Sequence, residues 1–136
     1  MKEYRAKLLY LRIAPRKTRL VADLVRGESA VRARHQLEFS TQRAAVPLLK
    51  LLKSALANAQ KQDESLDENS LYIKELRVDA GPILHRYRAA SRGMVAPIEK
   101  KTSHITITLT KREAKPKSKS QKPKIQNKNQ KEKTKV

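Results

Sequence analysis

Residues 80–98 read AGPILHRYRAASRGMVAPI and contain no acidic side chain. The stretch lies between two segments with strand-like patterns, Leu71–Asp79 and His104–Thr110. If these segments pair as antiparallel neighbours, their connection is far longer than an ordinary hairpin loop. The simplest solution is that both strands continue outward as a long ribbon that bends at Gly81-Pro82 and turns near Arg92-Gly93. With about ten residues in each arm, such a ribbon projects on the order of 30 Å.

An isolated two-stranded ribbon is marginally stable in water, and this one lacks a wide hydrophobic face. It therefore needs a surrounding partner. Its arginines and lysines can contact phosphates, Tyr87 can stack on a base, and the small residues keep the tip narrow. A basic loop without a single conformation is the alternative interpretation.

The two flanking segments carry clear strand signals. In His104–Thr110, HITITLT, the apolar side chains of Ile105, Ile107 and Leu109 alternate with threonines, which predicts a half-buried strand with the threonines on the other face. The apolar phase of Leu71–Asp79 changes between Ile73 and Leu76, and a β-bulge would explain this change. Arg5–Ile13 is short and apolar-rich and ends before a proline, so it predicts a further strand.

Three helices are expected between the first strand and the later pair. The first begins at Pro15 and ends before Gly27, and the second runs from a cap at Ser29 to about Glu38. The third runs from about Gln42 to Gln62, with a kink or its true start near Pro47. The apolar residues expected to pack are Leu20, Val21, Leu24 and Val25 in the first helix, Ala30, Ala33 and Leu37 in the second, and Ala45, Leu48, Leu49, Leu52, Ala55, Leu56 and Ala59 in the third.

This order of elements predicts an α+β domain. We expect a small antiparallel three-stranded sheet, three helices packed on one of its faces, and a long protruding β-hairpin at about residues 80–102. Composition changes near Lys111: residues 111–136 carry a net charge of +9 and only three apolar side chains. We therefore expect a folded domain over residues 1–110, followed by a basic disordered tail.

The formal net charge is +19, from 32 Lys and Arg against 13 Asp and Glu, which favours a polyanionic partner. Nucleic acid fits better than a membrane, because no apolar run approaches the length of a transmembrane helix. The chain has no cysteine, and no export signal is visible. We therefore expect no membrane association.

Four pieces of the chain resemble the large-subunit ribosomal protein twenty-two family, bacterial type. They are APRKTRLVADLVRG (residues 14–27), LLKSALANA (51–59), VDAGPILHRYR (78–88) and KKTSHITI (100–107). Their order and spacing are near those of the family. The resemblance implies a cytoplasmic protein of the large ribosomal subunit that binds the large-subunit ribosomal RNA, supports assembly and contacts neighbouring ribosomal proteins. It also implies that the hairpin lines the peptide exit tunnel.

The charge pattern and the resemblance together give the candidate site residues. The residues expected to contact RNA are Arg12, Arg16, Lys17, Arg19, Arg86, Tyr87, Arg88, Arg92, Lys100, Lys101, Ser103 and His104. The residues expected at the tunnel-facing tip, near the nascent peptide, are Ala89, Ala90, Ser91, Arg92, Gly93, Met94 and Val95. No homo-oligomer is expected.

Other chemistry has weak support. The acidic loop DESLDEN, residues 63–69, lacks the spacing and the glycine of an EF-hand, and the three histidines show no metal-ligand pattern. No phosphate-binding loop, dinucleotide fingerprint or nucleophile elbow is present, so no enzyme, metal or cofactor is expected. An architectural DNA-binding protein that uses a basic β-ribbon arm is the main alternative.

Overall fold

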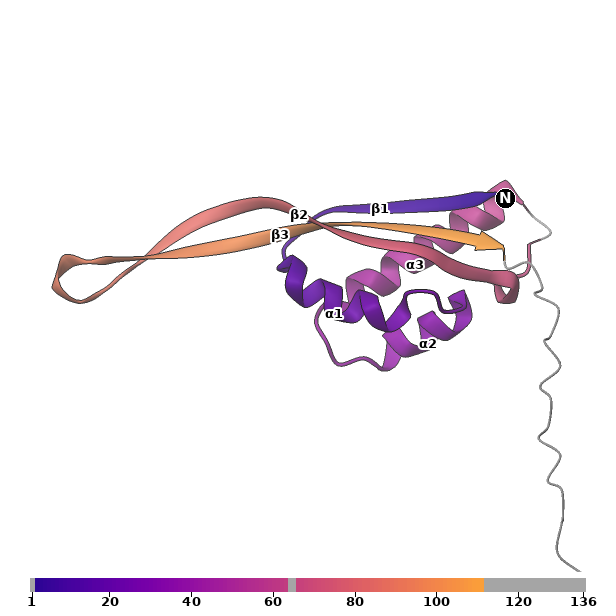
Figure 1. Ribbon diagram of the computed structural model, residues 1–136, viewed down its shortest axis with the longest axis horizontal. Helices are drawn as coiled ribbons and strands as arrows, with labels where there is room; N and C mark the ends of the chain where they lie inside the picture. Colours follow the sequence, from indigo (N-terminus) through magenta and orange to yellow (C-terminus); the bar gives the residue numbers. More distant parts are fainter. Residues whose placement is uncertain (1, 64–65, 112–136) are drawn as a thin grey trace, which may run out of the picture.

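The computed structural model describes residues 2–63 and 66–111 as an α+β domain with a projecting hairpin (Figure 1). The strands are β1 (Glu3–Leu11), β2 (Leu71–Ala89) and β3 (Val95–Lys111), and the α-helices are α1 (Pro15–Val25), α2 (Ala30–Phe39) and α3 (Ala45–Gln62). A short 3-10 helix, Glu68–Ser70, precedes β2, and the turn of the hairpin, Ser91–Gly93, precedes β3. The predicted fold class is confirmed. The tail predicted for residues 111–136 lies outside the described residues, except that Lys111 ends β3.

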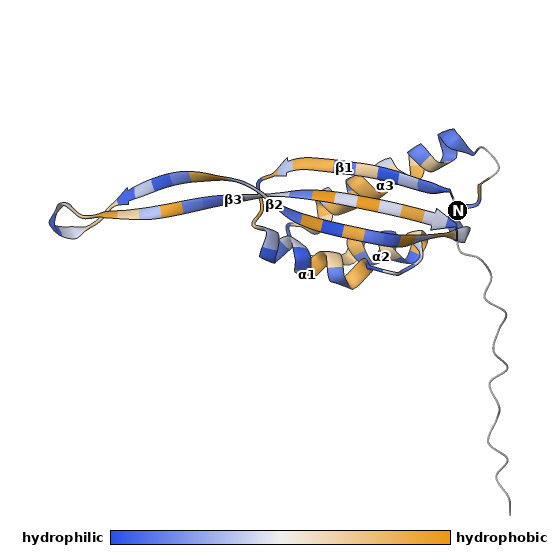
Figure 2. Ribbon diagram, turned by 45° about the horizontal axis from the view of Figure 1, so that its top comes forward, coloured by the Kyte–Doolittle hydropathy of each residue, from blue (hydrophilic) through white to orange (hydrophobic). Residues whose placement is uncertain are grey.

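The sheet has the order β1-β3-β2, and β3 pairs antiparallel with both neighbours. The helices lie on one side of it, and the outer parts of β2 and β3 extend well past the helices (Figure 1). Ile105, Ile107 and Leu109 are buried in the core beneath the helices, as predicted. Figure 2 shows the hydrophobic residues of β3 alternating with polar ones in the body of the sheet.

The face of β3 that points away from the helices is more buried than the sequence suggested. Thr108 and Thr110 were expected on an open face, but both are buried. Because β3 is the central strand, long side chains from both neighbours can cover it. Lys74 of β2 forms an ion pair with Glu3 of β1, so one such pair joins the two edge strands across β3.

The pairing of each edge strand with β3 contains a shift in register. The register of β2 shifts between Ile73 and Glu75, which confirms the predicted bulge, and it shifts again between Ala80 and Ile83 at the predicted bend. The first strand lies two residues earlier than expected. It ends at Leu11 because Tyr10 adopts a positive φ of 55° and breaks the register with β3.

Helix α1 has the predicted bounds but packs through a different face. Pro15 occupies its first turn, Ala14 supplies no side-chain cap, and Gly27 follows its end with a φ of 79°. Val21 and Val25 are buried as predicted, but Leu20 is 61% exposed and Leu24 is 58% exposed. The other side chains that α1 buries in the core are Pro15, Thr18 and Ala22.

The other two helices follow their apolar patterns closely. The predicted face of α2 is buried, and the Ser29 side chain makes no capping hydrogen bond although Ser29 is the N-cap residue. Helix α3 begins at Ala45, so Pro47 falls in its first turn, where no intrahelical N–H bond is lost. Leu51 is buried there in place of Leu49, which is only partly buried.

Candidate nucleic-acid interface

The projecting hairpin is held by its own strand pairing. Its Cα partners run from Ile83 with Lys101 to Ala89 with Val95, and every residue from 82 to 101 is exposed. The predicted turn is confirmed, because Arg92 and Gly93 have positive φ values of 57° and 68°. A ribbon of this kind has no hydrophobic core of its own and gains rigidity from a partner that surrounds it.

The two faces of the hairpin differ in chemistry. Alternate residues of paired strands point to opposite faces. The register places Arg86, Arg88 and Lys100 on one face, together with Leu84, Ala96 and Ile98. This cationic face carries no acidic side chain.

The opposite face is nearly neutral. It carries Ile83, His85, Tyr87, Ala89, Val95 and Pro97, and its only two charged residues are Glu99 and Lys101. These two form an ion pair of 3.1 Å. Tyr87 is 79% exposed, so its ring is free to stack, but it lies on the face opposite Arg86 and Arg88.

Side-chain hydrogen bonds hold the base of the hairpin to the body. Thr102 Oγ1 donates a hydrogen bond of 2.7 Å to the Pro82 carbonyl, and Ser103 Oγ donates one of 3.0 Å to the Ile13 carbonyl. His104 Nδ1 accepts a bond of 3.1 Å from the Tyr10 N–H, and the two rings meet edge-on at 4.8 Å. Because the Ser103 side chain is fully buried, we leave Ser103 out of the proposed RNA contacts.

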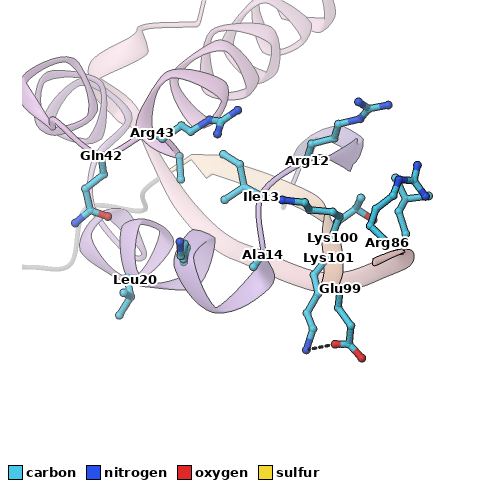
Figure 3. A pocket seen from close by; sticks show the side chains of 14 residues that line it. Arg12, Ile13, Ala14, Leu20, Gln42, Arg43, Arg86, Glu99, Lys100 and Lys101 are labelled. Carbon is cyan, nitrogen blue, oxygen red and sulfur yellow. Dashed lines mark ion pairs between the residues drawn. The ribbon is translucent and has the colours of Figure 1, made fainter. Parts of the chain in front are cut away.

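A basic groove opens where the hairpin leaves the body (Figure 3). Its volume is about 710 Å³, and its walls come from the β1–α1 connection, the start of α1, the α2–α3 connection and the hairpin base. The charged side chains that line it are Arg12, Lys17, Arg43, Arg86, Lys100, Lys101 and Glu99. Since Glu99 pairs with Lys101, the remaining five cations give the groove a strong positive potential.

The groove brings together residues that lie far apart in the sequence. Arg12, Lys17, Arg86 and Lys100 were all expected to contact RNA, and they come from three separate segments. Arg43 and Gln42 were missed, because they lie in a short connection without any motif. The sequence marks Arg43 only as a basic residue shortly before a helix. Such residues are too common to identify a binding site.

Arg19 is placed differently from the other predicted cations. Its Nε and Nη2 donate bonds of 3.2 and 3.0 Å to the Val78 carbonyl, so it ties α1 to β2. Arg26 makes a similar bond of 3.0 Å to the Leu76 carbonyl. Arg19 does not line the groove. Arg16 is exposed and also lies outside the groove.

The acidic side chains of the body are largely engaged by neighbouring cations. The Lys2 ammonium and the Tyr4 hydroxyl bond to Asp63 and hold the pKa of that carboxyl below its ordinary value. Lys74 and Arg5 lower the pKa of Glu3 in the same way. Among residues 2–63 and 66–111, no ion pair engages Arg86, Arg88 or Lys100. These three cations of the hairpin are therefore not neutralised by an ion pair with any described residue.

Neither a metal site nor a membrane span is found in the described part of the chain. No group of three or more His, Cys, Asp or Glu side chains there could hold a metal ion. No helix there is both long and apolar enough to cross a bilayer. The fold and its surface define a small α+β protein that presents a cationic hairpin and groove to a polyanion.

The chain belongs to the family described as ribosomal protein L22p/L17e, whose model matches residues 6–110. A large ribosomal subunit protein uL22 from Bifidobacterium animalis subsp. lactis (strain AD011) is 47% identical over 109 residues, covering 77% of this chain and 92% of the relative. The uL22 protein of Chlamydia trachomatis serovar L2b is 47% identical over 104 residues, covering 76% and 93%. The uL22 protein of Anaeromyxobacter sp. (strain K) is 47% identical over 102 residues, covering 75% and 70%. The resemblance in the sequence is confirmed.

Proposed function

We infer that the protein is a structural constituent of the large ribosomal subunit, where it binds ribosomal RNA and acts in translation without catalysis. Membership of the L22p/L17e family supports this function, and the cytoplasm is the corresponding location. The observation that carries the RNA-binding role is the exposed hairpin, one face of which bears cations and no carboxylate. Such a face suits the phosphates of a folded RNA that encloses it.

The RNA contacts are proposed for the groove and the cationic hairpin face. Arg12, Lys17 and Arg43 would bind phosphates at the groove, and Arg86, Arg88 and Lys100 would continue the contact along the hairpin. Arg16 and Arg92, which are exposed outside the groove, and Lys101, which lines the groove and pairs with Glu99, are proposed as further phosphate contacts. Tyr87, on the opposite face, would stack on a base.

The tip of the hairpin is proposed to line the peptide exit tunnel near the nascent peptide. Residues 89–95 are exposed, and they include the uncharged side chains of Met94 and Val95, which are 68% and 61% exposed. Only Arg92 among them is charged. A tip of this composition can contact passing peptides without binding them strongly. We propose one copy per subunit, not a homo-oligomer, with ribosomal proteins as further neighbours and a supporting role in assembly.

The division of the chain into a domain and a tail is also a proposal. Residues 1–110 would form the RNA-binding domain. Residues 111–136 carry a net charge of +9, and this charge would add to the attraction toward RNA.

The proposed function is tested by competition at fixed salt. Purified protein is bound to labelled large-subunit ribosomal RNA and challenged with unlabelled ribosomal RNA or with duplex DNA of equal phosphate content. We expect ribosomal RNA to compete at lower concentration, because a folded RNA can enclose the hairpin. Equal or better competition by duplex DNA would favour the architectural DNA-binding alternative.

A further inference from the structure

The groove at the hairpin base exposes apolar side chains, which a surface that binds only phosphates does not need. Ile13, Leu20 and Leu84 line it together with the cations. Figure 3 shows Ile13 between Arg43 and Arg12, with Leu20 and Gln42 at one end and Arg86 and Lys100 at the other. Leu20 is 61% exposed and Leu84 is 39% exposed, so the protein itself leaves these apolar side chains uncovered. Phosphates alone would not cover them.

The volume of the groove limits the size of the ligand that can enter it. Its volume of about 710 Å³ lies within the range of sites that enclose small ligands, about 300–1,000 Å³. A single nucleotide is of this scale, whereas a paired RNA helix would lie across the rim. Bases that proteins read in RNA are usually unpaired ones, which can be splayed out and placed against side chains.

The groove also offers polar groups suited to a base and its neighbouring phosphates. The Gln42 side-chain amide carries both donors and an acceptor for a base edge, and no hydrogen bond to the described residues occupies it. Arg43 and Arg12 flank the apolar centre. Ala14, at the start of α1, lines the groove and leaves the helix start without a side-chain cap.

Two of the groove walls, the β1–α1 connection and the hairpin base, are held to β3 by hydrogen bonds. The Ile13 carbonyl accepts the bond from Ser103 Oγ, and the Pro82 carbonyl accepts the bond from Thr102 Oγ1. The segment before α1 and the hairpin base are therefore held to the same part of β3. A site whose walls are fixed before binding loses less entropy when it orders a ligand.

We propose that this groove receives one unpaired nucleotide extruded from the ribosomal RNA. Its base would lie against Ile13 and Leu20, with Gln42 at the base edge, and the flanking phosphates would lie at Arg12, Arg43 and Lys100. The proposal rests on the proposed RNA-binding function and adds a specific pocket to it. A side chain of a neighbouring ribosomal protein could occupy the same space, and the experiment below distinguishes the two occupants.

The test uses base-specific chemical probing of large-subunit ribosomal RNA bound to the full-length protein. Two groove variants, Leu20→Ser and Arg43→Ala, are compared with two surface controls, Leu24→Ser and Arg32→Ala. Leu24 matches Leu20 in exposure on the same helix, and Arg32 is an exposed arginine on α2; neither lines the groove. Circular dichroism is used to check that all four variants are folded.

We expect wild-type protein and both controls to protect at least one unpaired base. Both groove variants should lose this protection while other protected positions persist, and each should bind roughly tenfold more weakly. Unchanged protection in both groove variants would overturn the pocket while leaving the proposed function intact. No specific protection by wild-type protein would contradict the RNA-binding function itself.

A fluorescent variant gives a second readout. The chain has no tryptophan, so Leu20→Trp and Leu24→Trp each introduce a single reporter. Binding of ribosomal RNA should quench Leu20→Trp and shield it from acrylamide at least threefold more than Leu24→Trp. Equal quenching of the two reporters would contradict the proposal. So would quenching of Leu20→Trp that requires an added ribosomal protein, since a protein would then fill the groove.

Discussion

Gly81 and Thr102 face each other at the base of the hairpin with no room for a side chain between them. A Cβ atom on Gly81 would lie 2.5 Å from Thr102 Oγ1 and 3.1 Å from His104 Nε2. Thr102 Oγ1 is held in place by its bond to the Pro82 carbonyl. The close approach therefore sets how the hairpin leaves the sheet, at the point where Gly81 and Pro82 interrupt the register of β2.

Gly81→Ala should destabilise the protein by about 1–3 kcal/mol, since a methyl group is forced into a filled space. Urea unfolding of the full chain measures this free energy. Thr102→Ala alone should cost about 1 kcal/mol through its lost hydrogen bond. The double variant should cost less than the sum of the two, because Thr102→Ala removes the atom that the new methyl group meets. Strict additivity would show that the two residues do not conflict.

Arg19 and Lys17 lie two residues apart on α1 and should behave differently. Arg19→Ala should lower the free energy of unfolding by about 1.5 kcal/mol, because it removes the bonds to the Val78 carbonyl. Lys17→Ala should leave stability unchanged. It should reduce the salt dependence of RNA affinity, measured as the slope of log K against log salt, by about 0.7–0.9. The reverse result would show that Arg19 contacts the RNA and that Lys17 stabilises the fold.

Acid should weaken the contact between β1 and the end of α3. Lys2 and Tyr4 lower the pKa of Asp63 from its ordinary value of 3.8, so Asp63 stabilises the folded protein above that pH. This contribution is lost as the pH falls through the lowered pKa of the folded state. Asp63→Asn should therefore show a shallower loss of stability below about pH 4 than wild type.

Urea unfolding at a series of pH values measures this difference. Asp67→Asn, which removes a carboxylate outside the cluster, serves as the control and should follow the wild-type curve. If Asp63→Asn loses stability as steeply as wild type between pH 4 and pH 2, Asp63 is not the group responsible.

The hairpin should be dispensable for folding. Arg86 and Ile98 are Cα partners, so replacing Tyr87–Pro97 by an Asn-Gly turn closes a shorter hairpin with a favoured geometry. The free energy of unfolding should stay within about 0.5 kcal/mol of wild type, since the removed residues are all exposed. Affinity for ribosomal RNA should fall but persist. Loss of cooperative unfolding in this variant would show that the hairpin belongs to the folding unit.

The sequence was informative where one local pattern determined the structure. Alternation identified the buried residues of β3, and Gly81-Pro82 and Arg92-Gly93 identified the bend and the turn. The bulge in β2 was visible as a change of apolar phase. These features depend on neighbouring residues only.

The sequence was misleading where tertiary neighbours decided the outcome. Leu20 and Leu24 fit the helical stripe of α1, but the helix turns Thr18, Val21, Ala22 and Val25 inward. Thr110 is buried because it lies on the central strand, paired with both Glu3 and Tyr72, and Arg43 lines the groove because the α2–α3 connection forms one of its walls. None of these relationships involves residues close in sequence.

The most direct test of the hairpin as an RNA-enclosed projection is a density map of the large ribosomal subunit that contains this chain. We expect residues 82–101 to extend away from the helices into ribosomal RNA, with Arg86, Arg88 and Lys100 against phosphates. A map that shows this hairpin in solvent, or folded back on its own helices, would contradict the proposed function.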